Sequence, residues 1–159
     1  MGKITVRDAR HDEAAIIVQM IRHMVVDMAS YGGNTPATDG AAWEKIVVAI
    51  AGELKGNNVK YLVAESANGE PIGVAGAELT TLGGAFAPKK TLHISVVYVV
   101  PLLRRGGIGG RLIAKLLDWG RAAGCELCDL NVLSGNPARS LYERCGFSVS
   151  EVKMVRSLV

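Results

Sequence analysis

Four glycines and two arginines lie close together between Arg104 and Gly110, in the stretch Arg-Arg-Gly-Gly-Ile-Gly-Gly. An ordered glycine loses more conformational entropy than any other residue, but it lets the backbone approach a ligand closely. The alternating residues 91–100 before this stretch predict a strand, and apolar residues at helical spacing from Ile108 predict a helix. Because a helix start presents unpaired amides and a positive dipole end, this stretch predicts a phosphate-binding loop.

Positive charge is concentrated around this loop. Residues 101–122 carry five basic side chains and one acidic side chain, whereas the whole chain has a net charge of only +3. Two common phosphate-binding patterns do not fit. The dinucleotide pattern G-x-G-x-x-G begun at Gly107 would need a glycine at Leu112. The nucleoside triphosphate pattern needs a Lys-Ser or Lys-Thr pair after its second glycine, and this loop lacks one.

A second group of residues runs from Asn136 to Phe147. Asn136 suits a helix cap, Pro137 suits the first helical position and Gly146 suits the end of a short helix. Tyr142 lies in this helix, and a phenol, with an ordinary pKa of about 10, can donate a proton in a reaction. A packing role is the alternative for Tyr142, in a stripe with Ala138, Leu141 and Cys145.

Proton transfer is the chemistry that His93 could supply. A side chain that titrates near neutral pH can take a proton from a nucleophile at pH 7. His93 lies on the polar side of the predicted strand 91–100, and imidazoles titrate near neutrality. Glu78 on the preceding strand is the alternative base, and a structural histidine is the competing interpretation.

The hydrophobic pattern predicts an α/β structure. The expected elements are a strand at 3–7, helices at 11–29 and 40–53, strands at 61–66, 71–79 and 91–100, a helix at 108–123, a strand at 127–133, a short helix after Pro137, and one or two strands within 147–158. Alternation in strand 91–100 places Leu92, Ile94, Val96 and Tyr98 on one face and His93, Ser95, Val97 and Val99 on the other.

The 159 residues are expected to form one domain, 1–159, with a core that needs no disulfide or metal. The longest apolar stretch, 94–103, is too short to span a bilayer, and the first residues lack the apolar core of a signal peptide. A cytoplasmic location follows by default. Three cysteines, Cys125, Cys128 and Cys145, are expected to be reduced core residues, and no metal site is predicted.

The sequence Arg104-Arg105-Gly106-Gly107-Ile108-Gly109 resembles [Q/R]-x-x-G-x-[G/A], the acetyl-CoA signature of the GNAT N-acetyltransferase superfamily. The stretch from Asn136 through Tyr142 to Gly146-Phe147 resembles the second signature of that family. The resemblance implies a GNAT fold: a mixed, mostly antiparallel sheet of six to seven strands, splayed between its fourth and fifth strands and flanked by about four helices. Acetyl-CoA would lie in the splayed region as co-substrate, without a metal.

Carried over by position, the resemblance gives each residue a role. Backbone groups of Val97 and its neighbours would pair with pantetheine, backbone amides after Arg104 would hold the diphosphate, and Tyr142 would face the thioester sulfur. The residues expected to bind the cofactor are Val97, Tyr98, Val99, Arg104, Arg105, Gly106, Gly107, Ile108, Gly109, Gly110, Arg111, Asn136 and Tyr142. The expected catalytic residues are Tyr142, His93 and the Val97 amide, which would stabilise the oxyanion.

The expected function is transfer of the acetyl group of acetyl-CoA to a primary amine, by direct attack in a ternary complex. The alternative is a non-catalytic, CoA-binding sensor domain of the same fold. The acceptor is a small-molecule amine or a peptide or protein amine, selected by the first two helices and by residues 31–40 and 80–90. No nucleic-acid or membrane partner is expected, and relatives of this kind are often homodimers. An acyl donor longer than acetyl stays open.

Overall fold

A computed structural model describes residues 2–158 of the chain. Five strands form one sheet in the order of the sequence: β1 (Thr5–Asp8), β2 (Val59–Glu65), β3 (Pro71–Leu82), β4 (Lys89–Val99) and β5 (Leu127–Leu130). Neighbouring strands are antiparallel except β4 and β5, which are parallel. The predicted mixed, mostly antiparallel α/β sheet is therefore confirmed.

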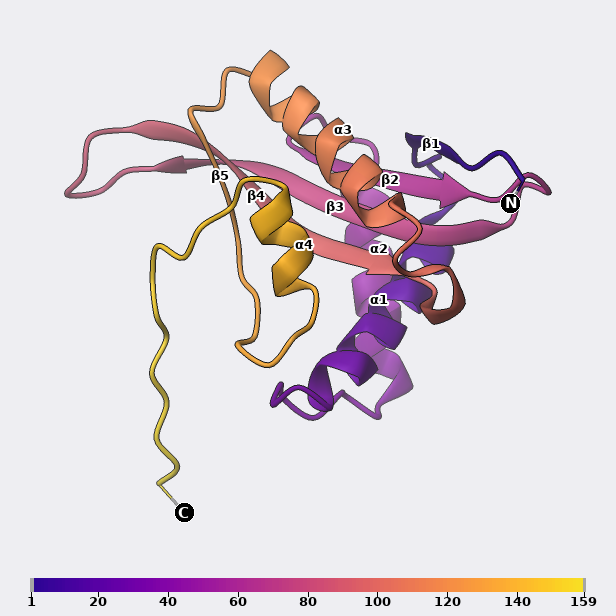
Figure 1. Cartoon of the computed structure of the whole chain (residues 1–159), viewed down its shortest axis with the longest axis horizontal. Coiled ribbons are helices and arrows are strands. Elements are labelled where there is room, and N and C mark those ends of the chain that lie inside the picture. Colours follow the sequence, from indigo (N-terminus) through magenta and orange to yellow (C-terminus); the bar gives the residue numbers. More distant parts are fainter. Residues whose placement is uncertain (1, 159) are drawn as a thin grey trace.

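Four α-helices cover the two faces of this sheet (Figure 1). They are α1 (Ala14–Ala29), α2 (Gly40–Glu53), α3 (Ile108–Ala122) and α4 (Arg139–Arg144), and a short 3-10 turn, η1 (Pro101–Leu103), follows β4. Asp39 caps α2, because its carboxylate accepts a hydrogen bond of 2.9 Å from the Ala41 amide. The helical stripe predicted from Ile108 is also buried, through Leu112 and Leu116.

The core is divided between the two faces. Leu62, Ile94 and the buried side chains of α3 form a cluster on one face, whereas Ile17, Tyr61 and Tyr98 pack with α1 and α2 on the other. Residues 61–64 of β2 are all buried because helices lie over both sides of the sheet. The sheet thus separates a side that carries the glycine loop from a side that faces the first two helices.

The predicted alternation along β4 is wrong after Ile94. The register between β3 and β4 shifts by one residue, so that Ser95 has no cross-strand partner. This β-bulge turns the following side chains over, since Val96 and Tyr98 join the α1 and α2 cluster while Val97 and Val99 join the α3 cluster. Leu92 and Val96, which the sequence pattern places together, lie on opposite faces.

The sheet has five strands, not the six to seven expected. Residues 147–158 contain no helix or strand, and their described side chains from Ser148 onward are exposed. In Figure 1 this yellow segment extends away from the sheet instead of returning to the β5 edge. A strand requires hydrogen bonds to a neighbour, so an alternating sequence without one stays outside the sheet. Strand β5 also ends at Leu130, three residues early.

Two further properties concern residues 2–158 only. None of the described helices is both long and apolar enough to cross a membrane. The described side chains also contain no group of three or more His, Cys, Asp or Glu residues that could hold a metal ion.

Candidate active site

One edge of β4 changes its partner partway along the strand. Parallel pairing with β5 covers only residues 91–94, which face residues 127–130. On the other side, the Val100 amide donates a 3.0 Å hydrogen bond to the Ile72 carbonyl of β3. Because bonded and non-bonded pairs alternate along an antiparallel ladder, Val97 and Val99 direct their amides and carbonyls away from β3. No strand within the described residues pairs with this part of the edge.

The open edge leads directly into the glycine loop. After η1, Arg105 adopts a left-handed conformation with φ of 67°, and Gly107 caps α3 with φ of 79°. The first hydrogen bond of α3 beyond the cap runs from the Arg111 amide to the Gly107 carbonyl at 3.1 Å. Amides at the start of the helix therefore have no helical acceptor, and they form the anion-binding end of the helix dipole.

Two arginines that flank the loop, Arg104 and Arg111, are held by protein groups. The Arg104 side chain donates to the Val99 carbonyl at 2.9 Å and to the Asp27 carboxylate of α1 at 2.5 Å. It also lies 5.4 Å from the ring centre of Tyr98. Arg111 donates to the Ile4 carbonyl at 2.9 Å. These two guanidiniums hold the loop against α1 and the N-terminal segment, so the backbone amides are the better-placed donors for a phosphate.

Helix α4 packs against the first turn of α3. A Cβ atom at Gly109 would lie 2.8 Å from Cδ2 of Leu141, so glycine allows this close approach. The predicted end of α4 is confirmed, because the Phe147 amide bonds to the Tyr142 carbonyl at 3.0 Å around Gly146, whose φ is 92°. The helix begins at Arg139, slightly later than expected. The two sequence signatures are therefore in direct contact.

Asn136 and Tyr142 are the two residues of the second signature that were expected to lie in the site. The Asn136 side chain accepts a 2.9 Å bond from the Ala138 amide, which stabilises the turn before α4. The residue at the cap position of α4 is Ala138, so the predicted cap at Asn136 is two residues early. Tyr142 packs on the α3 cluster, with its ring edge-on to Phe147 at 6.2 Å. Burial raises the pKa of the Tyr142 phenol above its ordinary value. The phenol is therefore held in its neutral, proton-donating form.

His93 has a carboxylate on each neighbouring strand. In register it stands opposite Glu78 on β3 and opposite Asp129 on β5. Its Nδ1 is in hydrogen-bond contact with the Asp129 carboxylate. The His93 side chain is 27% exposed, so it is accessible at the surface of the sheet. Asp129 did not feature in the sequence interpretation, because the pairing of β4 with β5 is what brings it to the histidine.

The comparisons with known proteins agree with this geometry. The sequence profile of the acetyltransferase (GNAT) family matches residues 23–147, from α1 through the end of α4. The chain belongs to the GNAT acetyltransferase family. Acyl transfer is therefore its class of activity. No curated protein sequence matches the chain.

Solved structures show the same GNAT fold at low sequence identity. A mutant of the BH1408 protein from Bacillus halodurans is 18% identical with a TM-score of 0.81, covering 98% of this chain and 99% of its own. A predicted acetyltransferase from Clostridium acetobutylicum, solved with acetyl-CoA, is 17% identical with a TM-score of 0.79 and covers 98% and 97%. Glucosamine-6-phosphate N-acetyltransferase from Arabidopsis thaliana is 16% identical with a TM-score of 0.71 and covers 99% of both chains.

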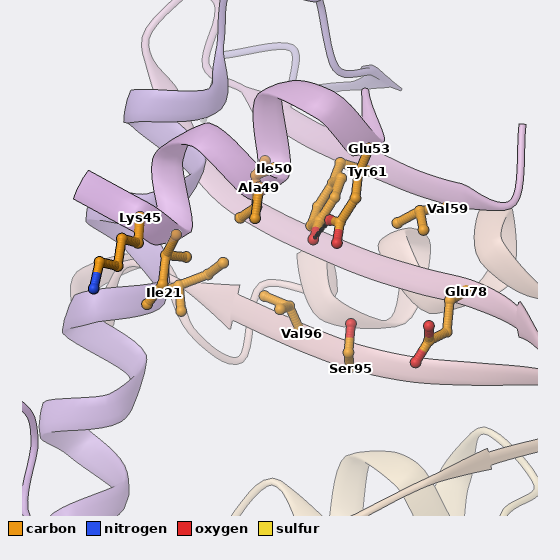
Figure 2. A pocket seen from close by; sticks show the side chains of 11 residues that line it. Ile21, Lys45, Ala49, Ile50, Glu53, Val59, Tyr61, Glu78, Ser95 and Val96 are labelled. Atoms are coloured by element: carbon orange, nitrogen blue, oxygen red, sulfur yellow. Dashed lines mark hydrogen bonds between the residues drawn. The ribbon is translucent and has the colours of Figure 1, made fainter. Parts of the chain in front are cut away.

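This GNAT chain also has a pocket of about 420 Å³ on the sheet face that carries α1 and α2. Figure 2 shows Tyr61, Glu78 and Ser95 of the sheet facing Ile50 and Glu53 of α2. The Tyr61 hydroxyl donates to the Glu53 carboxylate at 2.8 Å. Burial, together with this carboxylate, raises the pKa of Tyr61. The pocket reaches the β4 bulge, since Ser95 and Val96 form part of its wall.

Sequence reasoning missed Tyr61 and Glu53. Nothing in their spacing connects a strand tyrosine to a glutamate at the end of the preceding helix. A Cβ atom at Gly76 would lie 2.6 Å from Cε1 of Tyr61, so the small residue on β3 makes room for this ring. In the segment 80–90, expected to help select the acceptor, residues 80–82 belong to β3 and 89–90 to β4, with Leu82 paired to Lys89, and residues 83–88 form the connection between the two strands.

Proposed function

We propose that this protein transfers the acetyl group of acetyl-CoA to a primary amine, by direct attack within a ternary complex. One observation carries the proposal: the unpaired edge of β4 continues into a loop whose amides have no helical acceptor. An extended chain of amides, such as pantetheine, can bond to an open strand edge, and a diphosphate can bond at the start of a helix. The two sites adjoin in the order that coenzyme A would require.

The cofactor would be held mainly by backbone groups. The Val97 carbonyl and the Val99 amide would bond pantetheine, because they face the open edge while the backbone of Tyr98 faces β3. The amides from Arg105 to Gly110 would bind the diphosphate, where Gly107 supplies the left-handed turn. Gly109 of this loop lies beside Leu141 of α4, so α4 and its Tyr142 are close to the proposed diphosphate site.

Three groups of this chain would stabilise the charge and transfer the protons of the reaction. The amine lone pair attacks the thioester carbonyl carbon, so that a C–N bond forms and the Val97 amide stabilises the oxygen that becomes negative. The C–S bond then breaks, and Tyr142 donates its proton to the departing thiolate. His93 accepts the proton lost by the amine, with Glu78 as the alternative acceptor.

The acceptor would enter through the pocket between α2 and the sheet. Its walls include Ile21, Ile46 and Ile50, while Glu53 and Glu78 add negative charge. Such a site suits a cationic amine with an apolar stem, carried either by a small molecule or by a peptide side chain. An amine acceptor also agrees with the Arabidopsis protein of similar fold, whose name is glucosamine-6-phosphate N-acetyltransferase.

Release of free thiol from acetyl-CoA across a panel of small amines, amino acids, aminoglycosides and lysine peptides tests the proposal. Calorimetry with coenzyme A provides the second measurement. Thiol release that depends on one amine class, together with heat from coenzyme A, supports the acetyltransferase. Binding of coenzyme A without turnover on any amine would contradict it and indicate the sensor domain.

A further inference from the structure

Asp129 lies at the point where β4 and β5 separate. The pair formed by His93 and Asp129 is one position before Ile94 and Leu130, which are the last residues to pair. Beyond them the β4 edge opens toward Val97. The contact between the Asp129 carboxylate and Nδ1 of the histidine is therefore made at the closed end of the region proposed for the thioester.

We propose that Asp129 is a positioning residue, which orients the His93 imidazole so that Nε2 accepts the proton of the attacking amine. This inference rests on the proposed function. It adds a residue to which neither the sequence motifs nor the family signatures give a role. It also distinguishes the two nitrogens of the histidine, because only one of them is in contact with Asp129.

The chemistry of the contact fixes which nitrogen carries the proton. An ionised carboxylate can only accept hydrogen bonds, so the neutral imidazole must donate from Nδ1 to Asp129. The lone pair of the imidazole then lies on Nε2, so Nε2 is the nitrogen that can act as the general base. Glu78 on β3 is the other charged group in register with His93, and it too can only accept.

The position of His93 makes the proton transfer indirect. The β3 partners of His93 and Val97, Glu78 and Ala75, are only three positions apart because of the bulge at Ser95. A strand rises by about 3.3 Å per residue, so the Cα atoms of His93 and Val97 lie roughly 10 Å apart. A water molecule or the acceptor itself must connect Nε2 to the reaction centre. An indirect transfer needs a fixed imidazole orientation, which the contact with Asp129 supplies.

The exposure of the pair separates this role from a structural one. Asp129 is 60% exposed, and exposed ion pairs contribute little to stability. Asp129→Asn should therefore leave the thermal unfolding midpoint unchanged. The matched control is Asp118→Asn on α3, because Asp118 is 76% exposed and contacts the neighbouring Arg121 at 2.7 Å.

The first test is a double-mutant cycle on kcat with the best amine of the panel. Asp129→Asn and His93→Gln should each lower kcat by about tenfold or more, since general base catalysis contributes factors of about 10² to 10⁴. In the His93→Gln background, Asp129→Asn should have no further effect, because it acts through the histidine. Asp118→Asn should keep the wild-type rate.

The second test does not depend on turnover. Long-range ¹H–¹⁵N NMR spectra of the full chain at about pH 8.5, well above the ordinary histidine pKa of about 6.5, report which ring nitrogen is protonated. The wild-type protein should show His93 protonated at Nδ1, and Asp129→Asn should lose this preference. A histidine protonated at Nε2 in the wild type, or additive losses in the cycle, would overturn the inference. Its failure differs from that of the proposed function, which is shown by absence of turnover on every amine.

Discussion

The phenol of Tyr142 is the group whose removal should affect chemistry most selectively. Tyr142→Phe should lower kcat by about 100-fold, within the range for loss of a general acid, while the Kd for acetyl-CoA stays within about twofold. The phenylalanine ring preserves the packing against Phe147, so the fold should not change. Thiol-release kinetics and calorimetry on the same preparation measure both quantities. A variant with the wild-type kcat would rule out the acid role.

The pH dependence of the same residue has a definite sign. Burial raises the pKa of Tyr142, so the neutral phenol persists to a higher pH than an exposed tyrosine would allow. Any loss of kcat caused by ionisation of Tyr142 should therefore begin above about pH 10, the ordinary value. The kcat of the wild type and of Tyr142→Phe, measured up to about pH 10, checks this. A fall in the wild-type kcat below pH 10 that is absent from Tyr142→Phe would contradict it.

Single residues were predictable where a local motif defines them. Gly107 and Gly146 are glycines because both adopt positive φ, at the start of α3 and the end of α4. Tyr61, Glu53 and Asp129 were not predictable, because their partners lie on other elements and depend on strand register. Short-range spacing encodes the turns and caps, whereas the acceptor side of the site is encoded only by tertiary packing.

Strand β4 shows why one feature at the level of an element escaped prediction. Residues 96–100 are Val-Val-Tyr-Val-Val, so apolar side chains occupy both faces and a one-residue shift leaves the hydrophobic pattern unchanged. The shift at Ser95 is visible only in the pairing with β3. It matters for the site, because the bulge determines that the amides of Val97 and Val99, and not that of Tyr98, face the open edge.

The glycine loop gives a prediction that separates cofactor binding from stability. Gly107→Ala and Gly69→Ala place a Cβ on residues with φ of 79° and 78°, and both have open space around the new atom. Each should cost about 1 kcal/mol of stability through backbone strain. Only Gly107→Ala should weaken coenzyme A binding, by about tenfold or about 1.4 kcal/mol. Urea unfolding and calorimetry compare the two, and equal affinities in both variants would contradict the diphosphate site.

For the whole molecule, the order of helices and strands up to α4 was predictable from hydrophobic periodicity and turn residues. The last strands were not, because residues 147–158 form no strand although their apolar positions fit one. A periodic pattern shows which side of a segment could be buried, but it does not show whether a neighbouring edge is in reach. The single-domain interpretation and the cytoplasmic location remain predictions.

Arg7 of β1 pairs with Glu13, at the cap of α1, and with Glu65 of β2, and this ion cluster should determine the acid stability of the whole molecule. Glu13 is 2% exposed and accepts two bonds from Arg7 at 2.7 and 2.8 Å. Hydrogen bonding by Arg7 lowers the pKa of Glu13 below its ordinary value. The stabilisation is therefore complete above the unfolded pKa of about 4.3 and is lost as the pH falls through the lower folded value.

Glu13→Gln should reduce the free energy of unfolding by about 3 kcal/mol at pH 7, because it removes the buried one of the two carboxylates that pair with Arg7. The difference from wild type should shrink below about pH 4 as Glu13 becomes protonated. Glu143→Gln, in an exposed pair with Arg139, is the control and should cost less than about 1 kcal/mol. Urea unfolding at both pH values measures this, and equal losses for the two variants would show that the cluster is not stabilising.

The central claim is that the open edge of β4 and the loop after it bind coenzyme A through backbone amides. Titration of the ¹⁵N-labelled protein with coenzyme A, followed by amide chemical shifts, tests it most directly. We predict that the largest shifts occur at Val97, Val99 and residues 105–110, with little change in the β2–β3 turn around Gly69. Shifts that concentrate elsewhere, or none at millimolar coenzyme A, would contradict the account.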